Sequence, residues 1–248
     1  APGAFKHEEE KRPAVEMRTR TRQAKALRAA AACIIPAALL IISCVDGKKQ
    51  VLEKAFSEFR GNHVLYVSKS EFTLYVYDRK GRVAAKYPVA WGLNPDRKPK
   101  LYRGDNRTPE GSYRVVEILS MDADRASASY RKLKRMNDVY WRARDGHYRH
   151  GNPREDLGDN AYGPRFFLLD YPNEEDRRRY EMALAKGEVP SRDGAPVPIG
   201  HGIAIHGNND PQSLGQLATS GCVRMFNNDI IELERFIILG TPVIISGD

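Results

Sequence analysis

Residues 202–225 read Gly-Ile-Ala-Ile-His-Gly (202–207), Asn-Asn-Asp-Pro-Gln-Ser-Leu-Gly-Gln-Leu-Ala-Thr (208–219) and Ser-Gly-Cys-Val-Arg-Met (220–225). A short apolar strand is predicted to end at His206, and the glycine after it lets the chain turn sharply. A polar loop follows, and a second glycine directly before Cys222 permits a close approach of main chain or ligand. We therefore expect His206 and Cys222 to meet across this loop.

A cysteine beside a histidine indicates acyl-transfer chemistry. A neutral imidazole within hydrogen-bond reach takes the thiol proton, and the resulting cation holds the thiolate, which lowers a thiol pKa that is otherwise about 8.5. The backbone N–H groups around Gly221 and Cys222 are predicted to hold the oxyanion that develops on the attacked carbonyl.

Two separated motifs in this order resemble the catalytic domain of the YkuD-type L,D-transpeptidases. The first motif is Gly104 to Tyr113 (GDNRTPEGSY), which looks like the segment that opens a strand in that family, and Leu65 to Tyr77 looks like its first hairpin. The second is His206-Gly207 followed by residues 220–225, which resembles the family's catalytic signature. The resemblance covers about residues 61–247.

The resemblance implies a mainly β, sandwich- or barrel-like domain with a few helices, one of which follows the catalytic cysteine. It also implies action on peptidoglycan stem peptides: a thiolate cleaves the bond between diaminopimelate and D-Ala, D-Ala leaves, and the acyl group of the resulting thioester passes to an amine acceptor, from a second stem or a lipoprotein, or to water. No cofactor and no metal are implied. The roles carried over by motif are nucleophile for Cys222, base and then acid for His206, part of the oxyanion site for Gly221, and substrate positioning for Ser220, Gly207 and Arg224. Arg224 either shapes the pocket or meets a substrate carboxylate, which a planar bidentate donor suits.

Departures from the family pattern keep alternatives open. Many members carry His directly before the Gly-Cys pair, whereas this chain has Ser220, so the group that orients His206 is unassigned. The segment 121–165 and the charged segment 174–186 resemble a subgroup that includes lipoprotein-detaching hydrolases. A hydrolase that releases a lipoprotein or trims stems is therefore one alternative. A non-catalytic, tethered cell-wall-binding module is another, and a general cysteine peptidase is a third.

The N-terminal region is typical of a targeting segment. Residues 1–16 are expected to be untranslated in the cell or disordered, because Met17 begins a compact leader in which basic residues precede the uncharged run 29–43. Residues 17–44 are predicted to be a signal peptide with a lipobox, in which Cys44 is the lipidation candidate, or an uncleaved signal anchor. Residues 45–60 are predicted to be a linker or small helix. An exported domain, periplasmic or in the cell envelope and tethered to a membrane, is expected.

The net charge limits which partners are expected, and the cysteine count limits which disulfides can form. The formal net charge is +8, but residues 1–28 hold eight Lys and Arg against four Glu, so the remaining sequence carries only +4. A nucleic-acid partner is therefore not expected. Of the three cysteines, Cys33 and Cys44 lie in the apolar run and at its end, which leaves Cys222 as the one thiol of the predicted domain and excludes a disulfide within it.

Runs rich in β-branched and aromatic residues, with a sequence pattern of period two, predict strands over 63–67, 72–77, 83–90, 111–118, 166–170, 202–206 and 242–246. A charged surface helix is expected from the cap Asn173 to Gly187. An apolar-faced helix is expected after the cap Asn228-Asp229, with Ile230, Leu233, Ile237 and Ile238 on one face and Gly240 as its stop. Residues 121–165 have weak periodicity and are interpreted as a long excursion that could cover a cleft. His147 and His150, with Asp145 and Asp156, are interpreted as a solvated loop rather than a metal site, and His201 as structural.

Overall fold

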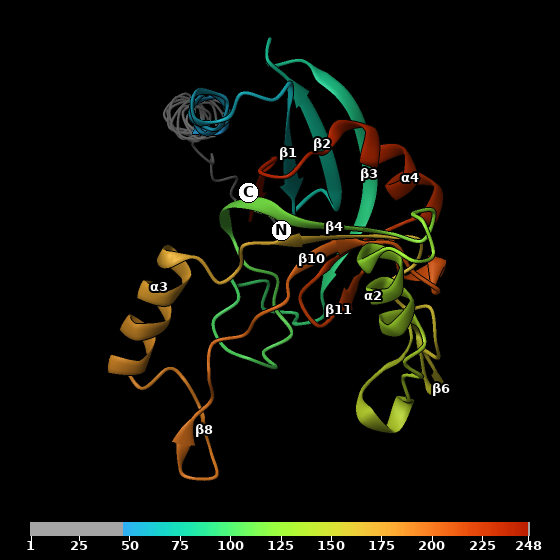
Figure 1. The fold of residues 1–248 in the computed structure, drawn as a ribbon. Coiled ribbons are helices and arrows are strands. Elements are labelled where there is room, and N and C mark those ends of the chain that lie inside the picture. The colour runs from blue at the N-terminus through green and yellow to red at the C-terminus, as the bar shows by residue number, and fades with distance from the viewer. Residues whose placement is uncertain (1–46, 248) are drawn as a thin grey trace, which may run out of the picture. The chain divides into compact units, whose positions relative to one another are not determined.

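The computed structural model describes residues 47–247, so the expectations for residues 1–44, including Cys44, lie outside the described residues. The chain divides into two units, Ala1–Lys48 and Lys49–Asp248, and every described strand belongs to the second. The strands are shown in Figure 1. They are β1 (His63–Ser68), β2 (Thr73–Asp78), β3 (Val83–Gly92), β4 (Gly111–Ser120), β5 (Tyr148–Arg149), β6 (Asn152–Asp156), β7 (Arg165–Leu169), β8 (Ser191–Arg192), β9 (Ala195–Pro196), β10 (Ala204–His206), β11 (Leu217–Thr219), β12 (Val223–Met225) and β13 (Pro242–Ser246).

The main sheet closes on itself. Its order is β11-β3-β12-β10-β7-β4-β13-β1-β2, and β2 pairs back with β3, so that eight strands form a ring and β11 is added beside β3. The two ten-residue strands, β3 and β4, each pair with different neighbours along their length. β3 pairs with β2 through its first half and with β12 through Val89 and Ala90, while β4 pairs with β13 and then with β7. The prediction of a mainly β, barrel-like fold is confirmed.

The interior of the ring is filled by alternate side chains of its strands. β2 shows the pattern, because Leu74 and Val76 are fully buried while Thr73 and Tyr75 are only partly so. Burying large apolar side chains is the main source of folding free energy, at about 25 cal/mol per Å² of apolar surface. The same cluster includes Phe167 of β7, Ile205 of β10 and Val223 of β12. The strands that carry the predicted site are therefore anchored in the core.

Four helices of the described residues accompany the sheet, and the first covers residues 47–58, within the predicted linker. Its Leu52 is buried against a cluster that includes Tyr66, Tyr77 and Ile244. α2 (Ala128–Asn137) follows β4, α3 (Glu174–Ala185) follows β7, and α4 (Asn227–Leu233) follows β12.

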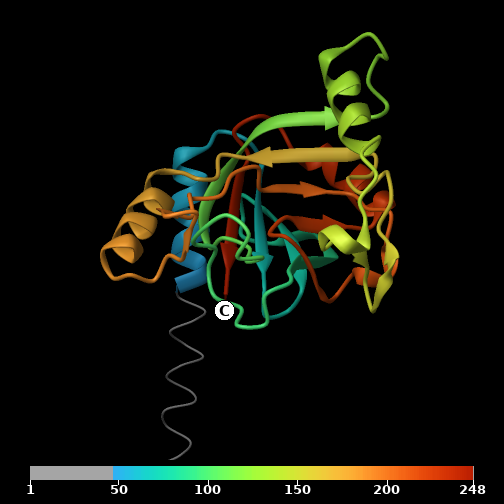
Figure 2. The ribbon, with the colours of Figure 1, turned by 90° about the horizontal axis from the view of Figure 1, so that it is seen from below.

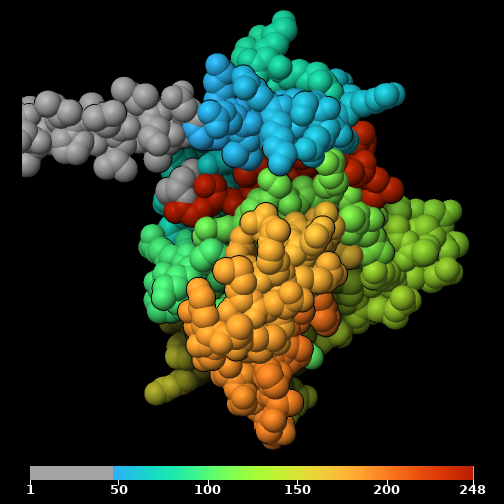
Figure 3. Space-filling view, turned by 90° about the vertical axis from the view of Figure 1, so that its left-hand side faces the viewer, coloured from blue at the N-terminus to red at the C-terminus, as the bar shows by residue number. Residues whose placement is uncertain are grey.

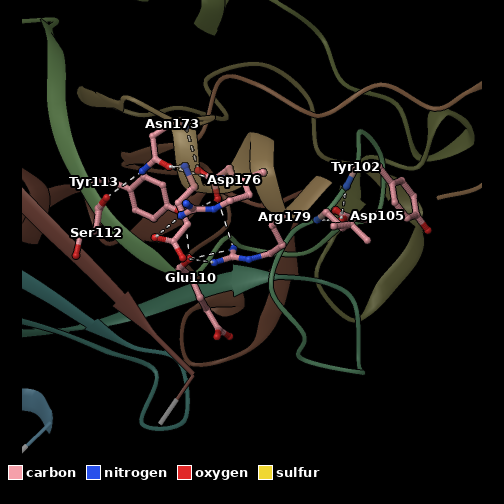
Figure 4. Close-up of polar contacts among 11 residues, drawn as sticks. Tyr102, Asp105, Glu110, Ser112, Tyr113, Asn173, Asp176 and Arg179 are labelled. Atoms are coloured by element: carbon pink, nitrogen blue, oxygen red, sulfur yellow. Dashed lines mark hydrogen bonds and ion pairs between the residues drawn. The ribbon is translucent and has the colours of Figure 1, made fainter. Parts of the chain in front are cut away.

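The capping of α3 agrees with its sequence. Asn173 caps the helix through its side chain and completes a capping box with Asp176. The buried Asp176 also accepts a hydrogen bond from the Tyr113 hydroxyl at 3.0 Å (Figure 4), which joins α3 to β4. The helix is therefore attached to the ring at its first turn.

The expectation for the last helix was wrong at both ends. α4 begins at Asn227, before the predicted cap Asn228-Asp229, and its N-cap residue is Phe226, whose side chain has no hydrogen-bond acceptor. The helix ends at Leu233, and a 3₁₀ turn over Glu234–Phe236 redirects the chain, so Ile238 is 57% exposed. Ile230 and Leu233 are buried in the core as expected.

Two excursions leave the ring on different sides (Figures 1 and 2). The first, between β4 and β7, carries α2, β5 and β6, and the second, between β7 and β10, carries α3 and the β8–β9 hairpin. Figure 3 shows α3 and this hairpin together on one face of the molecule. The first excursion is the segment predicted to cover a cleft.

Candidate active site

His206 ends strand β10, and Cys222 directly precedes the neighbouring parallel strand β12. In the pairing of β10 with β12, Ile205 lies beside Val223 and His206 beside Arg224. Continuing this register places Cys222 beside Ala204. Because side chains alternate along a strand, His206, Cys222 and Arg224 belong to the same face. All three line one pocket of about 580 Å³.

The imidazole of His206 is held by the next residue's carbonyl. Its Nδ1 lies 2.6 Å from the oxygen of Gly207, which can only accept, so Nδ1 carries the hydrogen and Nε2 keeps its lone pair. The ring stacks on Phe166 and meets Tyr162 edge-on. The Gly207 carbonyl is thus the orienting group that sequence left unassigned.

Burial, assisted by the charge of Arg224, lowers the pKa of His206 to about 3. The ring is therefore neutral at physiological pH and able to accept a proton.

The thiol of Cys222 is half-buried, and its Sγ lies 3.6 Å from the carbonyl oxygen of Gly202. Burial raises the pKa of this thiol, and the Ala204 N–H group and the charges of Lys100 and Arg224 offset only part of that effect. The sequence prediction of a lowered thiol pKa therefore does not describe this resting state, because the neighbouring imidazole is neutral. The pair rests as a neutral thiol beside a neutral imidazole.

Gly221 shapes the turn before Cys222. Its φ is +139°, and a Cβ at this position would lie 2.7 Å from the carbonyl oxygen of Arg107. Its carbonyl accepts from the buried Thr108 hydroxyl at 2.8 Å, and that hydroxyl also accepts from the N–H of Gly92. The Gly104–Tyr113 motif thus fixes the cysteine loop.

The N–H group of Gly221 donates to Thr219 Oγ1 at 3.1 Å. The sequence predicts that this N–H group holds the oxyanion. In this structure it instead donates to a side chain of the same loop.

The other predicted positioning residues border the same site. A Cβ on Gly207 would lie 2.4 Å from Asn227 Oδ1 and 2.8 Å from Pro164 Cδ, so the close packing beside His206 requires glycine. Ser220 is exposed on the pocket wall. Arg224 is buried, and its Nη1 donates to Ser213 Oγ at 2.9 Å.

Several residues that line the pocket were missed by sequence reasoning. Lys100 is buried and pairs with Asp105 at 2.7 Å, and the Asp105 carboxylate also accepts from the N–H of Tyr102 (Figure 4). His147, which was predicted to lie in a solvated loop, packs its ring against Trp141. The two ring centroids are 4.3 Å apart, and both residues line the pocket. The remaining lining residues that sequence reasoning did not place there include Arg103, Tyr162 and His201.

Residues 47–247 contain neither a candidate metal site nor a candidate membrane-spanning helix. This part of the chain has no group of three or more His, Cys, Asp or Glu side chains placed to hold a metal ion. It also has no helix with the length and apolar character needed to cross a bilayer.

The similarity to known proteins is concentrated in this domain. A protein of Bacillus subtilis (strain 168) named as L,D-transpeptidase YkuD is 48% identical over 42 residues, which are 17% of this chain and 26% of that protein. The chain thus spans about a quarter of that relative's length. The solved structure of Bd1075 from Bdellovibrio bacteriovorus shares 24% identity over 75% of this chain and 48% of that chain, with a TM-score of 0.44. The helical cell shape determining protein Pgp2 from Campylobacter jejuni shares 20% identity over 75% of this chain and 47% of that chain, also with a TM-score of 0.44.

A family model covers most of the chain. The model of the L,D-transpeptidase catalytic domain (YkuD) matches residues 62–245, which include the ring of strands up to the last residue but one of β13, the Gly104–Tyr113 motif and both His206 and Cys222. The chain therefore belongs to the L,D-transpeptidase catalytic domain family.

Proposed function

We propose that this chain is a peptidoglycan L,D-transpeptidase in which Cys222 is the nucleophile and His206 the proton-transfer group. One observation carries the proposal: the two side chains, one at the end of β10 and one just before β12, line the same pocket, and the imidazole is oriented by the Gly207 carbonyl. A nucleophile, a base and a third group that orients the base are what nucleophilic catalysis requires.

The proposed reaction has two halves. Nε2 of His206 takes the proton from Cys222 Sγ as the sulfur bonds to the carbonyl carbon of diaminopimelate. The bond from that carbon to the D-Ala nitrogen breaks, His206 returns the proton to the leaving amine, and a thioester remains. An acceptor amine, from a second stem or a lipoprotein, then gives a proton to His206 as its nitrogen bonds to the same carbon, the carbon–sulfur bond breaks, and the thiol is reprotonated.

The low pKa of His206 suits the first half-reaction. A neutral imidazole is ready to accept the thiol proton, so proton transfer accompanies attack and does not depend on a thiolate formed in advance. Gly207, Gly221 and Ser220 are proposed to position the reacting groups, and Arg224 to contact substrate. With water in place of the amine, the same site would trim the stem.

We also propose that the domain works in the cell envelope. The basic and apolar segments of residues 17–44, with Cys44 as the lipidation candidate, support export and a membrane tether.

The test is to incubate the purified protein with a defined stem tetrapeptide, with and without an amine acceptor, and to identify the products by mass spectrometry. Loss of D-Ala with transfer to the amine is expected for the wild type, and no turnover is expected for Cys222→Ala. Arg178→Gln, a change on the exposed face of α3, serves as the control variant.

Other products would change the conclusion. Loss of D-Ala without transfer under several acceptors would identify a hydrolase. No turnover together with retention on cell walls would identify a binding module, and ready cleavage of casein would contradict the cell-wall assignment.

A further inference from the structure

The buried guanidinium of Arg224 lacks a full set of partners. Among the described residues it makes one hydrogen bond, from Nη1 to the Ser213 hydroxyl, and its buried Nε has no hydrogen-bond partner. The Asp210 carboxylate lies 3.9 Å from Nη1, beyond hydrogen-bond distance, and already accepts from the N–H of His150 at 2.7 Å. A buried charge that is not fully paired is costly, unless an anion completes its surroundings.

The pocket itself provides no such anion. Of the described residues that border it, none is a carboxylate, whereas Lys100, Arg103 and Arg224 are cationic. The charge of Lys100 is already matched by the buried Asp105. The thiol of Cys222 does not compensate Arg224 at rest, because its pKa is raised. The site is therefore suited to a ligand that brings a negative charge.

A small second hollow lies against the same residues. It measures about 50 Å³, and Arg224, His147, Thr219 and Ser220 border both it and the main pocket. The Nδ1 atom of His147 is buried and without a hydrogen-bond partner among the described residues. A space of this size holds a small polar group, since one water molecule occupies about 30 Å³ in the liquid.

The spacing from Cys222 to Arg224 indicates where the anion would lie. Residues two apart on a strand are separated by about 7 Å, and both side chains are on the pocket face. In a peptide that ends in D-Ala, the terminal carboxylate carbon is three bonds beyond the scissile carbonyl carbon, or about 4 Å. A carbonyl held about 3 Å from Sγ therefore places this carboxylate beside Arg224.

We propose that Arg224, together with His147 on the border of the same hollow, forms a subsite for the carboxylate of the residue that leaves, so that the enzyme selects a departing amine with a neighbouring carboxylate. This inference rests on the proposed function. Because an acceptor amine attacks from the side on which the leaving amine departs, the same subsite favours acceptors that carry a carboxylate next to the amine.

The experiment compares two substrates, a stem tetrapeptide that ends in D-Ala and its C-terminal carboxamide. The carboxamide has nearly the same shape but no charge. The wild type is expected to prefer the acid by about ten- to hundredfold in kcat/KM, the range expected for a hydrogen-bonded charge. Arg224→Gln is expected to lose this preference, because cleavage of the acid slows about ten- to hundredfold more than cleavage of the amide. Arg224→Lys is expected to retain part of it, and Arg178→Gln all of it.

Each other outcome has a definite meaning. Equal loss on both substrates in Arg224→Gln would show that Arg224 acts on the thiol or on folding, and would overturn the subsite. A wild type that cleaves acid and amide equally would also overturn it, even if no Arg224 variant folds. A wild type that cleaves neither substrate would instead contradict the proposed function. Inhibition of the wild type by free D-Ala but not by D-alaninamide is the further expected result, and equal inhibition by both would count against the subsite.

Discussion

At the scale of single residues, the main feature of the site is that its two reactive groups rest uncharged. Burial raises the pKa of Cys222 and lowers that of His206 to about 3. Each shift disfavours the charged form, so an ion pair is not the resting state. Deprotonation of the thiol must then depend on substrate or on alkaline pH.

This state predicts the pH dependence of alkylation. The rate at which iodoacetamide modifies Cys222, followed by peptide mapping, is expected to rise with pH and to reach half its maximum at a pH above the ordinary pKa of a cysteine thiol. A plateau that already begins near pH 5 would show a preformed thiolate and contradict the prediction.

The lowered pKa of His206 also predicts a pH dependence of stability. Between about pH 6.5 and pH 3 the unfolded chain binds a proton at this residue and the native protein does not, so the unfolding free energy falls as the pH falls through this window. The contribution is up to about 1.4 kcal/mol per pH unit. Urea unfolding at pH 7, 6 and 5 is expected to show a shallower decline for His206→Gln than for the wild type. If the unfolding free energy of both proteins fell equally with pH, a lowered pKa of His206 would not be the cause.

At the scale of elements, the cysteine loop is held by a segment far away in the sequence. The Thr108 hydroxyl donates to the Gly221 carbonyl and accepts from the Gly92 N–H group, so one side chain connects β3 to the turn before Cys222. Removing it leaves two buried backbone groups without this partner.

Thr108→Val is therefore expected to destabilise the protein by about 1–3 kcal/mol and to lower kcat/KM by about ten- to hundredfold. Thr108→Ser retains the hydroxyl and should recover most of the activity. Circular dichroism, unfolding and kinetics on the stem tetrapeptide provide the measurements. Wild-type kinetics in the valine variant would show that the loop does not need this support.

Local patterns predicted the elements better than their connections. The alternation of residues such as Leu74 and Val76 predicted the strands, and Asn173 predicted the start of α3. The start of α4 was predicted wrongly, because Asn228 and Asp229 are good capping residues whereas the helix in fact begins after Phe226, which cannot cap it.

The same limit applies to the site. The His206 and Cys222 motifs are visible in sequence, but the orienting group is a backbone carbonyl, which has no side-chain signature. The pocket wall formed by Lys100 and His147 depends on contacts with Asp105 and Trp141 that need the finished fold. In the sequence, the only sign of the Lys100 contact is that Asp105 follows five residues later, which is a weak signal for a buried ion pair.

At the scale of the whole second unit, stability depends on a ring of strands and on what packs outside it. The helix over residues 47–58 covers part of the outer surface, where Leu52 is 7% exposed against Val64, Tyr66 and Ile244. Its neighbour Val51 is 37% exposed. This pair offers a matched comparison.

Leu52→Ala is expected to lower the unfolding free energy by about 2–4 kcal/mol, because it removes buried atoms and leaves a cavity. Val51→Ala should change it by less than about 0.5 kcal/mol. Urea unfolding of both variants provides the measurement. Equal, small effects would show that this helix does not contribute to the stability of the domain.

The excursion between β4 and β7 supplies Trp141, His147 and Tyr162 to the pocket, whereas His206 and Cys222 belong to the ring or to the turn that enters it. The reacting groups and part of the pocket wall therefore come from separate stretches of the sequence. Because Tyr162 of this excursion also meets the His206 ring edge-on, exchanging residues 121–164 for the corresponding insertion of another family member should change the shape of the pocket and the packing of the imidazole together.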